Sequence, residues 1–152
     1  VYIRLSRMNV PVVFDENYKF NPQKAIVLKE GSDVTILTCG DILSEVINAA
    51  EILEEKGINA EIINVPVIKP LDCGTIINSV NKTKLAVTIE NHSVIGGLGS
   101  AVCECLAADA PNKVIRIGVN DCFGQSGSPD ELLKYYGLDA VSIADRIIEL
   151  KK

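Results

Sequence analysis

Five short apolar runs of strand character lie along this chain, and most of them are followed by a segment with apolar residues at helical spacing. Strands that alternate with helices at short intervals are typical of a mainly parallel sheet covered by helices on both faces. The runs are almost continuously apolar, as strands buried on both faces usually are. The sequence therefore predicts an α/β fold of three layers, α/β/α. The predicted strands are Ala25–Lys29, Val34–Cys39, Glu61–Val65, Leu85–Ile89 and Val114–Ile117.

The predicted helices have recognisable ends. The first is followed by Gly57, a residue type that commonly ends helices. Ser128 and Pro129 have the form of an N-cap followed by proline at the first helical position. A further helix is predicted over Leu98–Asp109. The apolar positions of the other helices are Leu43, Val46, Ile47, Ala50 and Leu53, then Ile76, Ile77 and Val80, and finally Val141, Ala144, Ile147 and Ile148.

The composition is that of a globular protein. Hydrophobic residues make up 47% of the 152 residues. No apolar run reaches the ~18 residues that a membrane-spanning helix needs. The net charge is −5, and Lys and Arg do not form the basic cluster that nucleic-acid binding requires. Neither a membrane nor a nucleic acid is therefore an expected partner.

The cysteines form an odd set without any C-x-x-C pair. We interpret them as small buried hydrophobic residues in a reducing compartment, and metal coordination is the alternative interpretation. No metal site is predicted from their spacing, and a cytoplasmic location is expected. The five cysteines are Cys39, Cys73, Cys103, Cys105 and Cys122.

The chain begins with a strand-like stretch, Val1–Leu5, and has no initiator methionine. Residues 8–24 are rich in Asn, Pro and polar groups, which is typical of a linker. We therefore expect residues 1–22 to be the last strand of a preceding domain plus a linker, and residues 23–152 to form the α/β domain. On this interpretation the chain is part of a longer protein.

The strand Leu85–Ile89 continues through Glu90 and the only histidine into a turn with three glycines within four positions. The start of the following helix favours an anion, and open α/β sheets place their sites beyond the carboxyl ends of strands. The turn lacks the third glycine of G-x-G-x-x-G and the lysine of a P-loop. Close packing of helix against strand requires glycine too, so packing and anion binding both stay open. The candidate residues for an anion or regulatory site are His92, Gly97, Gly99 and Ser100.

Three further features carry polar groups. His92 has the chemistry of an acid, a base or a phosphate donor, and a hydrogen bond that orders the loop is the alternative. The loop Asp121–Ser128 combines an acid, an aromatic ring and glycines but no nucleophile–base pair, so we expect a structural or interface role. Arg7 follows the opening strand and is suited to gripping a phosphate, with an exposed terminal arginine as the alternative. No catalytic residue is predicted.

These segments, in this order, resemble the C-terminal part of transketolases, in particular the second subunit of split transketolases. The match is carried by ENHSVIGGLGS at 90–100, RIGVNDCFGQSGSPDELLKYYGLDA at 116–140 and NVPVIKPLD at 64–72. The opening VYIRLSRMNVP resembles the final strand of the family's pyrimidine-binding domain, with its Ser-Arg-x-Asn element at 6–9. The resemblance implies a Rossmann-like domain with a mainly parallel five-stranded sheet and one antiparallel strand.

The resemblance also implies a thiamine diphosphate and Mg²⁺ enzyme of the pentose phosphate pathway. Such an enzyme transfers a two-carbon ketol unit from a ketose phosphate to an aldose phosphate, with the carbanion carried by the cofactor. The family holds this cofactor with a GDG motif and a later Asn in its N-terminal domain, and activates it with a Glu of the middle domain. Here the single Gly-Asp pair, Gly40-Asp41, is followed by Ile42. We therefore expect this chain to bind no cofactor and to be inactive alone.

The implied substrate contact is Arg7, which matches the phosphate-binding arginine of the Ser-Arg-x-Asn element, while Met8 stands where the family often has Gln. The implied partners are the N-terminal transketolase portion, a second copy in a homodimer, and sugar phosphates. Deoxyxylulose-phosphate synthases and 2-oxoacid dehydrogenase β subunits share the domain and stay alternatives. So do an anion-binding regulatory module and a domain that self-associates through the 118–128 loop. The Ser-Arg-x-Asn element and the Phe-Gly-x-Ser-Gly run at 123–127 favour transketolase.

Overall fold

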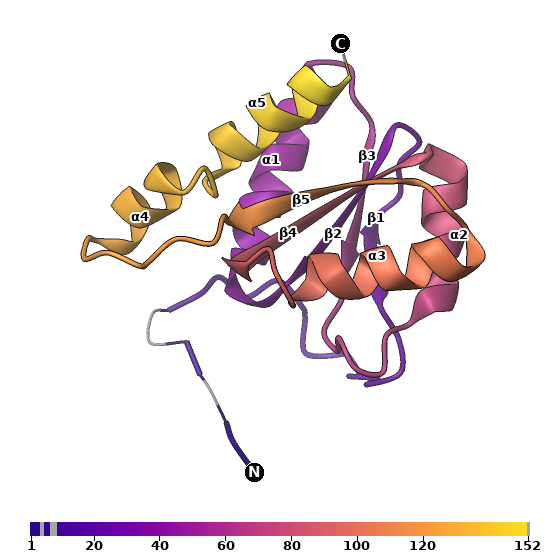
Figure 1. The fold of residues 1–152 in the computed structure, drawn as a ribbon, viewed down its shortest axis with the longest axis horizontal. Coiled ribbons are helices and arrows are strands. Elements are labelled where there is room, and N and C mark those ends of the chain that lie inside the picture. Colours follow the sequence, from indigo (N-terminus) through magenta and orange to yellow (C-terminus); the bar gives the residue numbers. More distant parts are fainter. Residues whose placement is uncertain (4, 7–8, 152) are drawn as a thin grey trace.

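The computed structural model of the chain describes residues 1–3, 5–6 and 9–151. From Ile26 onward the chain forms a sheet and its flanking helices (Figure 1). The strands are β1 (Ile26–Lys29), β2 (Val34–Cys39), β3 (Ala60–Asn64), β4 (Leu85–Ser93) and β5 (Lys113–Val119). The helices are α1 (Leu43–Glu55), α2 (Cys73–Thr83), α3 (Leu98–Asp109), α4 (Pro129–Tyr135) and α5 (Ala140–Leu150), with a 3-10 turn at Gly40–Ile42 before α1.

The sheet has the strand order β1-β3-β2-β4-β5. β1 runs antiparallel to β3, and the other neighbours are parallel. Helices α1 and α5 cover one face of the sheet, and α2 and α3 cover the other (Figure 1). The predicted three-layer α/β fold, with five strands of which one is antiparallel, is therefore confirmed for the described residues.

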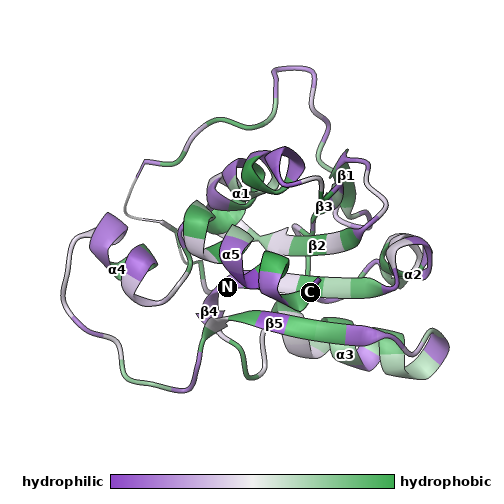
Figure 2. Ribbon diagram, turned by 90° about the horizontal axis from the view of Figure 1, so that it is seen from above, coloured by the Kyte–Doolittle hydropathy of each residue, from purple (hydrophilic) through white to green (hydrophobic). Residues whose placement is uncertain are grey.

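Each face of the sheet has its own apolar core. Neighbouring residues of β2 serve different cores, because side chains alternate between the two faces of a strand. Ile36 packs with Leu53 of α1 and Ile147 of α5, whereas Leu37 packs in the core that contains Leu98 of α3. Coloured by hydropathy, β2 is largely green, as expected of a central strand covered on both sides (Figure 2).

Several strand boundaries differ from the predictions by one or two residues, the end of β4 differs by more, and one predicted helix face is wrong at one position. Strand β4 runs past the predicted end at Ile89, because after an irregularity in its register Ser93 pairs again with Val119 of β5. The predicted apolar face of the last helix was wrong at Val141, which is 58% exposed, while Ile143 is fully buried. The predicted face is confirmed at Ala144 and Ile147, which are fully buried in the core that also contains residues of α1.

The described residues before Ile26 contain no helix or strand. The strand expected at Val1–Leu5 belongs, on the sequence interpretation, to a preceding domain and needs a neighbouring strand from it. That strand and the boundary after residue 22 therefore stay predictions. None of the helices in the described part of the chain has the length and apolar character needed to cross a membrane.

Candidate functional site

The carboxyl end of β4 is joined to the start of α3 by the side chain of Glu90, which is only 2% exposed. Its Oε2 accepts the backbone N–H of Leu98 at 2.8 Å, and its Oε1 accepts that of Gly99 at 2.9 Å. The first N–H groups of a helix have no partner within the helix, and the helix dipole favours a negative charge beside them. The anion at this helix start is therefore supplied by the chain itself.

Two glycines of the turn lie where a side chain would collide with its neighbours. A Cβ atom on Gly97 would lie 2.0 Å from Oε2 of Glu90. A Cβ atom on Gly99 would lie 2.8 Å from the Arg116 side chain and from the hydroxyl of Thr88. The packing interpretation of these glycines is therefore confirmed. An external anion at Gly97 and Gly99 would have to displace Glu90, and a regulatory ligand here stays a prediction.

The other two candidates of the turn, Ser100 and His92, make local hydrogen bonds. Ser100 Oγ accepts the N–H of Gly96 at 2.9 Å, and Gly96 has the left-handed φ of +78° that favours glycine. His92 is exposed near the end of β4, where its Nδ1 donates to the carbonyl of Ser93 at 3.2 Å. This contact is compatible with a hydrogen bond that orders the loop, and the role of His92 stays a prediction.

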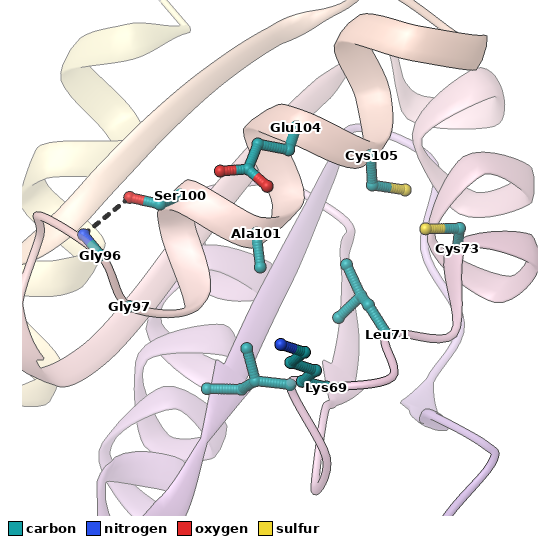
Figure 3. A pocket seen from close by; sticks show the side chains of 10 residues that line it. Lys69, Leu71, Cys73, Gly96, Gly97, Ser100, Ala101, Glu104 and Cys105 are labelled. Carbon is teal, nitrogen blue, oxygen red and sulfur yellow. Dashed lines mark hydrogen bonds between the residues drawn. The ribbon is translucent and has the colours of Figure 1, made fainter.

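A cavity of about 460 Å³ opens beside the first turns of α3 (Figure 3). One wall comes from the segment after β3, with Lys69 and Leu71, and the other comes from α3, with Ser100 and Glu104. Lys69 and Glu104 carry opposite charges, so the lining selects neither an anion nor a cation by charge alone. The cavity is a candidate ligand site without an evident nucleophile–base pair among the residues that line it.

The carboxyl end of β2 contacts the N-terminal segment. Oδ2 of Asp41 accepts the hydroxyl of Ser6, and its Oδ1 accepts the side-chain amide of Asn91, both at 3.4 Å. Phe14 and Asp41 help to line a second cavity of about 350 Å³. The N-terminal segment therefore approaches the sheet edge at which α/β proteins place their ligands. Arg7, the predicted phosphate-binding residue, lies outside the described residues.

Two observations on the described residues bear on the predicted absence of a thiamine diphosphate and Mg²⁺ site. Over residues 1–3, 5–6 and 9–151, no three His, Cys, Asp or Glu side chains are grouped so that they could hold a metal ion. The start of α3, which would otherwise attract a diphosphate, is taken by the carboxylate of Glu90. That this chain binds no cofactor stays a prediction.

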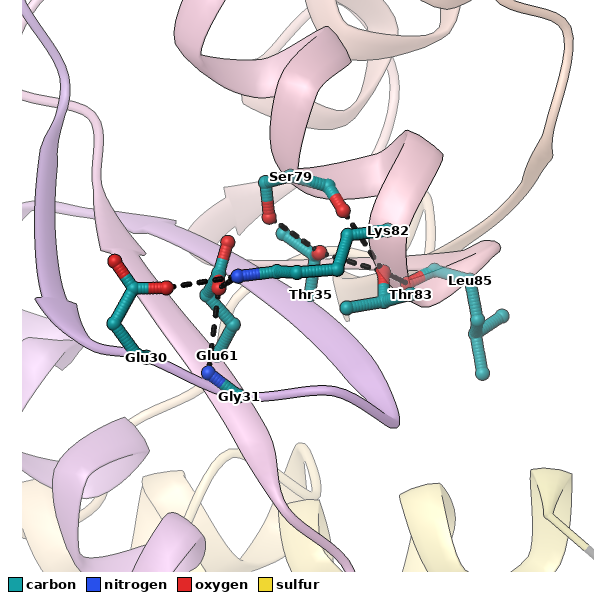
Figure 4. A network of polar contacts seen from close by, with 8 residues as sticks. All are labelled: Glu30, Gly31, Thr35, Glu61, Ser79, Lys82, Thr83 and Leu85. Carbon is teal, nitrogen blue, oxygen red and sulfur yellow. Dashed lines mark hydrogen bonds and ion pairs between the residues drawn. The ribbon is translucent and has the colours of Figure 1, made fainter.

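A buried polar network at the amino end of the sheet has a structural role (Figure 4). The carboxylate of Glu61 on β3, 2% exposed, pairs with Lys82 of α2 and accepts the N–H of Gly31 at 3.3 Å. Lys82 also pairs with exposed Glu30 at 2.8 Å. Burial raises the pKa of Glu61, but the hydrogen bonds it accepts, first from Lys82, hold it below the ordinary 4.5. The network ties the β1–β2 turn to β3 and α2.

The cysteines are all free, but they are not uniformly buried as predicted. Cys105 is buried, and burial raises the pKa of the partly exposed Cys39 to about 11. Cys122 is exposed because it lies in the loop after β5, so the prediction was wrong there. Cys73 and Cys105 are brought together beside the α3 cavity (Figure 3).

Two features of this region were missed from the sequence. The role of Glu90 has a local signal: a carboxylate ends an apolar strand shortly before a glycine turn and a helix start. The Cys73–Cys105 approach has no such signal, because these residues lie far apart in sequence and come from different helices.

A sequence profile described as transketolase, C-terminal domain, matches residues 23–143. The chain belongs to this family. This transketolase C-terminal domain is 46% identical over 155 residues to a protein of Methanocaldococcus jannaschii that bears the provisional name transketolase C-terminal section, covering 100% of this chain and 48% of that protein. It is 48% identical over 143 residues to a 6-deoxy-6-sulfo-D-fructose transketolase subunit of a Clostridium species, covering 94% of this chain and 44% of that subunit.

A solved structure described as a split gene transketolase, inactive beta4 tetramer, has the same fold, with a TM-score of 0.89 and 43% sequence identity. The match covers 94% of this chain and 47% of that one. The transketolase C-terminal domain thus spans about half the length of the curated relatives it matches. The resemblance inferred from the sequence motifs is confirmed at the level of the family.

Proposed function

We propose that this chain is the C-terminal portion of a transketolase, which transfers a two-carbon ketol unit from a ketose phosphate to an aldose phosphate. The observation that supports the proposal is the family match over residues 23–143, together with relatives about twice as long. In the complete enzyme the chain assembles with an N-terminal portion that carries thiamine diphosphate and Mg²⁺, and two such assemblies form a dimer. The chain alone is inactive, and the reaction belongs to the pentose phosphate pathway.

The residue of this chain that serves the reaction in this proposal is Arg7, through a bidentate contact with the substrate phosphate. Its place in the Ser-Arg-x-Asn element at 6–9 supports the assignment. Further support comes from Ser6, whose hydroxyl bonds Asp41 at the carboxyl end of β2. The role of the α/β domain is structural, in assembly rather than chemistry. A cytoplasmic location, expected from the cysteine pattern, stays a prediction.

Reconstitution tests this function. The chain and its N-terminal portion are purified together, loaded with thiamine diphosphate and Mg²⁺, and supplied with a ketose phosphate donor and an aldose phosphate acceptor. Ketol transfer that needs both portions is the expected result. A verified complex that transfers no ketol unit from any donor of a panel, with 6-deoxy-6-sulfofructose included, would contradict the assignment.

A second candidate is a deoxyxylulose-phosphate synthase. A 1-deoxy-D-xylulose-5-phosphate synthase of Caldanaerobacter subterraneus is 41% identical over 130 residues, covering 85% of this chain and 21% of the synthase. The same complex decides between the two, because a synthase condenses pyruvate with an aldose phosphate and releases carbon dioxide. Carbon dioxide release from pyruvate without ketol transfer would favour the synthase.

A further inference from the structure

Two thiols from different helices lie opposite each other at one end of the α3 cavity. Cys73 is the first residue of α2, Cys105 lies in the middle of α3, and their sulfur atoms point toward each other in Figure 3. The two helices pack side by side on the same face of the sheet. We propose that Cys73 and Cys105 are a modification site, and that they form a reversible disulfide bond when the protein meets a peroxide.

The two thiols differ in access and in acidity. Cys73 is partly exposed and lines the cavity, whereas Cys105 is only 8% exposed. Burial, and then the neighbouring Cys73 thiol, raises the pKa of Cys105 to about 12. Because the thiolate is the reactive form, Cys105 is a poor first nucleophile at neutral pH. Cys73 therefore meets the oxidant, and Cys105 completes the bond.

The reaction balances with hydrogen peroxide as the oxidant. The Cys73 sulfur attacks one peroxide oxygen, the O–O bond breaks, and the leaving hydroxide takes the thiol proton to become water. The sulfur of Cys105 then attacks the sulfenic sulfur of Cys73, the S–O bond breaks, and the second hydroxide leaves with the Cys105 proton as water. Two thiols lose two electrons, and one peroxide becomes two waters.

The geometry selects this pair among the cysteines. Cys103 lies two positions from Cys105 on α3, so it faces another direction, and it lines a different cavity with Pro111. Cys39 ends β2, and Cys122 lies in the exposed loop after β5. A bond between Cys73 and Cys105 would join the start of α2 to α3 across the end of the α3 cavity. The bond would also reduce the number of conformations open to the unfolded chain. The oxidised form should therefore melt at a higher temperature.

The test uses the chain with Cys122→Ser, which removes the exposed thiol that could crosslink separate molecules. After treatment with hydrogen peroxide and digestion without reductant, we expect one peptide pair joined through Cys73 and Cys105 and lighter by two hydrogens. Dithiothreitol should reverse it, and the oxidised form should melt roughly 5–10 °C higher. Cys103→Ser is the matched control and should give the same product.

Cys73→Ser and Cys105→Ala, checked for folding by circular dichroism, should each lose this product. A disulfide through any other cysteine would overturn the proposal. So would sulfinic acid at Cys73 with Cys105 still reduced. The peptide map of the Cys122→Ser chain decides the question even where a core variant does not fold.

Discussion

The backbone N–H of Gly99 donates to the carboxylate of Glu90 at 2.9 Å, so the one acidic residue of β4 caps the start of α3. The second carboxylate oxygen accepts the N–H of Leu98 at 2.8 Å. Gly97 leaves the space that this carboxylate occupies, since a Cβ there would lie 2.0 Å from it. The carboxylate therefore connects the end of the strand to the start of the helix. The turn requires glycine at position 97 because of this internal contact.

Replacing Glu90 with alanine should lower the free energy of unfolding by about 2–4 kcal/mol, because two buried N–H groups lose their acceptor and the helix start loses its negative charge. Glu90→Gln should lose less, since the amide oxygen still accepts one bond. Urea unfolding followed by circular dichroism measures both. Glu104→Gln is the control, because Glu104 is an exposed acid of α3. It should change the free energy of unfolding by less than about 0.5 kcal/mol. Equal stability of Glu90→Ala and this control would rule out the capping role.

Gly97→Ala should destabilise the fold by about 2–3 kcal/mol, because the added methyl group needs the space of the Glu90 carboxylate. The same unfolding experiment measures the loss. Gly124→Ala is the matched control: its Cβ would have no neighbouring atom within 4 Å, so we expect a change of less than about 0.5 kcal/mol. If both glycine variants behave alike, the close approach at Gly97 is not what the turn requires.

The order of strands and helices could be predicted because each element has a local sequence pattern of apolar residues and turn or capping residues. The bounds of α3, Leu98–Asp109, agree with the prediction because glycines precede it and Pro111 follows closely. The errors in the predicted bounds and faces arose where contacts between residues distant in sequence determine the structure. The extension of β4 to Ser93 depends on pairing with Val119.

The site was less predictable than the fold for the same reason. The sequence left packing and ligand binding open at the glycine turn, and it did not predict that the carboxylate of Glu90 accepts the N–H groups of Leu98 and Gly99. Which face of α5 is buried depends on where α1 lies, so Ile143 rather than Val141 enters the core. The Cys73–Cys105 pair exists only because α2 and α3 pack side by side.

Because of Glu61, the free energy of unfolding should depend on pH at acidic pH. The pKa of its carboxyl is held below 4.5, since the bonds from Lys82 and its other partners outweigh the effect of burial. A lowered folded-state pKa means that the ionised group stabilises the fold above pH 4.5 and that this contribution is lost as the pH falls through the folded-state value. The stability difference between the unsubstituted chain and Glu61→Gln should therefore shrink from about pH 7 to about pH 3.

Chemical unfolding at several pH values measures this difference. Glu30→Gln is the matched control, because Glu30 pairs with the same Lys82 but is 78% exposed, and exposed pairs contribute little. The Glu30→Gln difference should stay small throughout. A Glu61→Gln difference that keeps its size down to the acid end would show that the ionised form of Glu61 is not what stabilises the fold.

Arg7→Ala, in the reconstituted enzyme, should raise KM for a phosphorylated aldose acceptor roughly 10- to 100-fold, because the phosphate loses a charged, bidentate partner. Arg7→Lys should raise KM less than Arg7→Ala, since lysine keeps the positive charge but lacks the two parallel N–H donors of the guanidinium group. An acceptor without phosphate should show the same KM in all three enzymes. Arg146→Ala, which removes an exposed arginine of α5 paired with Glu149 at 3.5 Å, is the control and should change neither KM. If Arg7→Ala raises KM equally for both acceptors, Arg7 positions the segment instead of recognising phosphate.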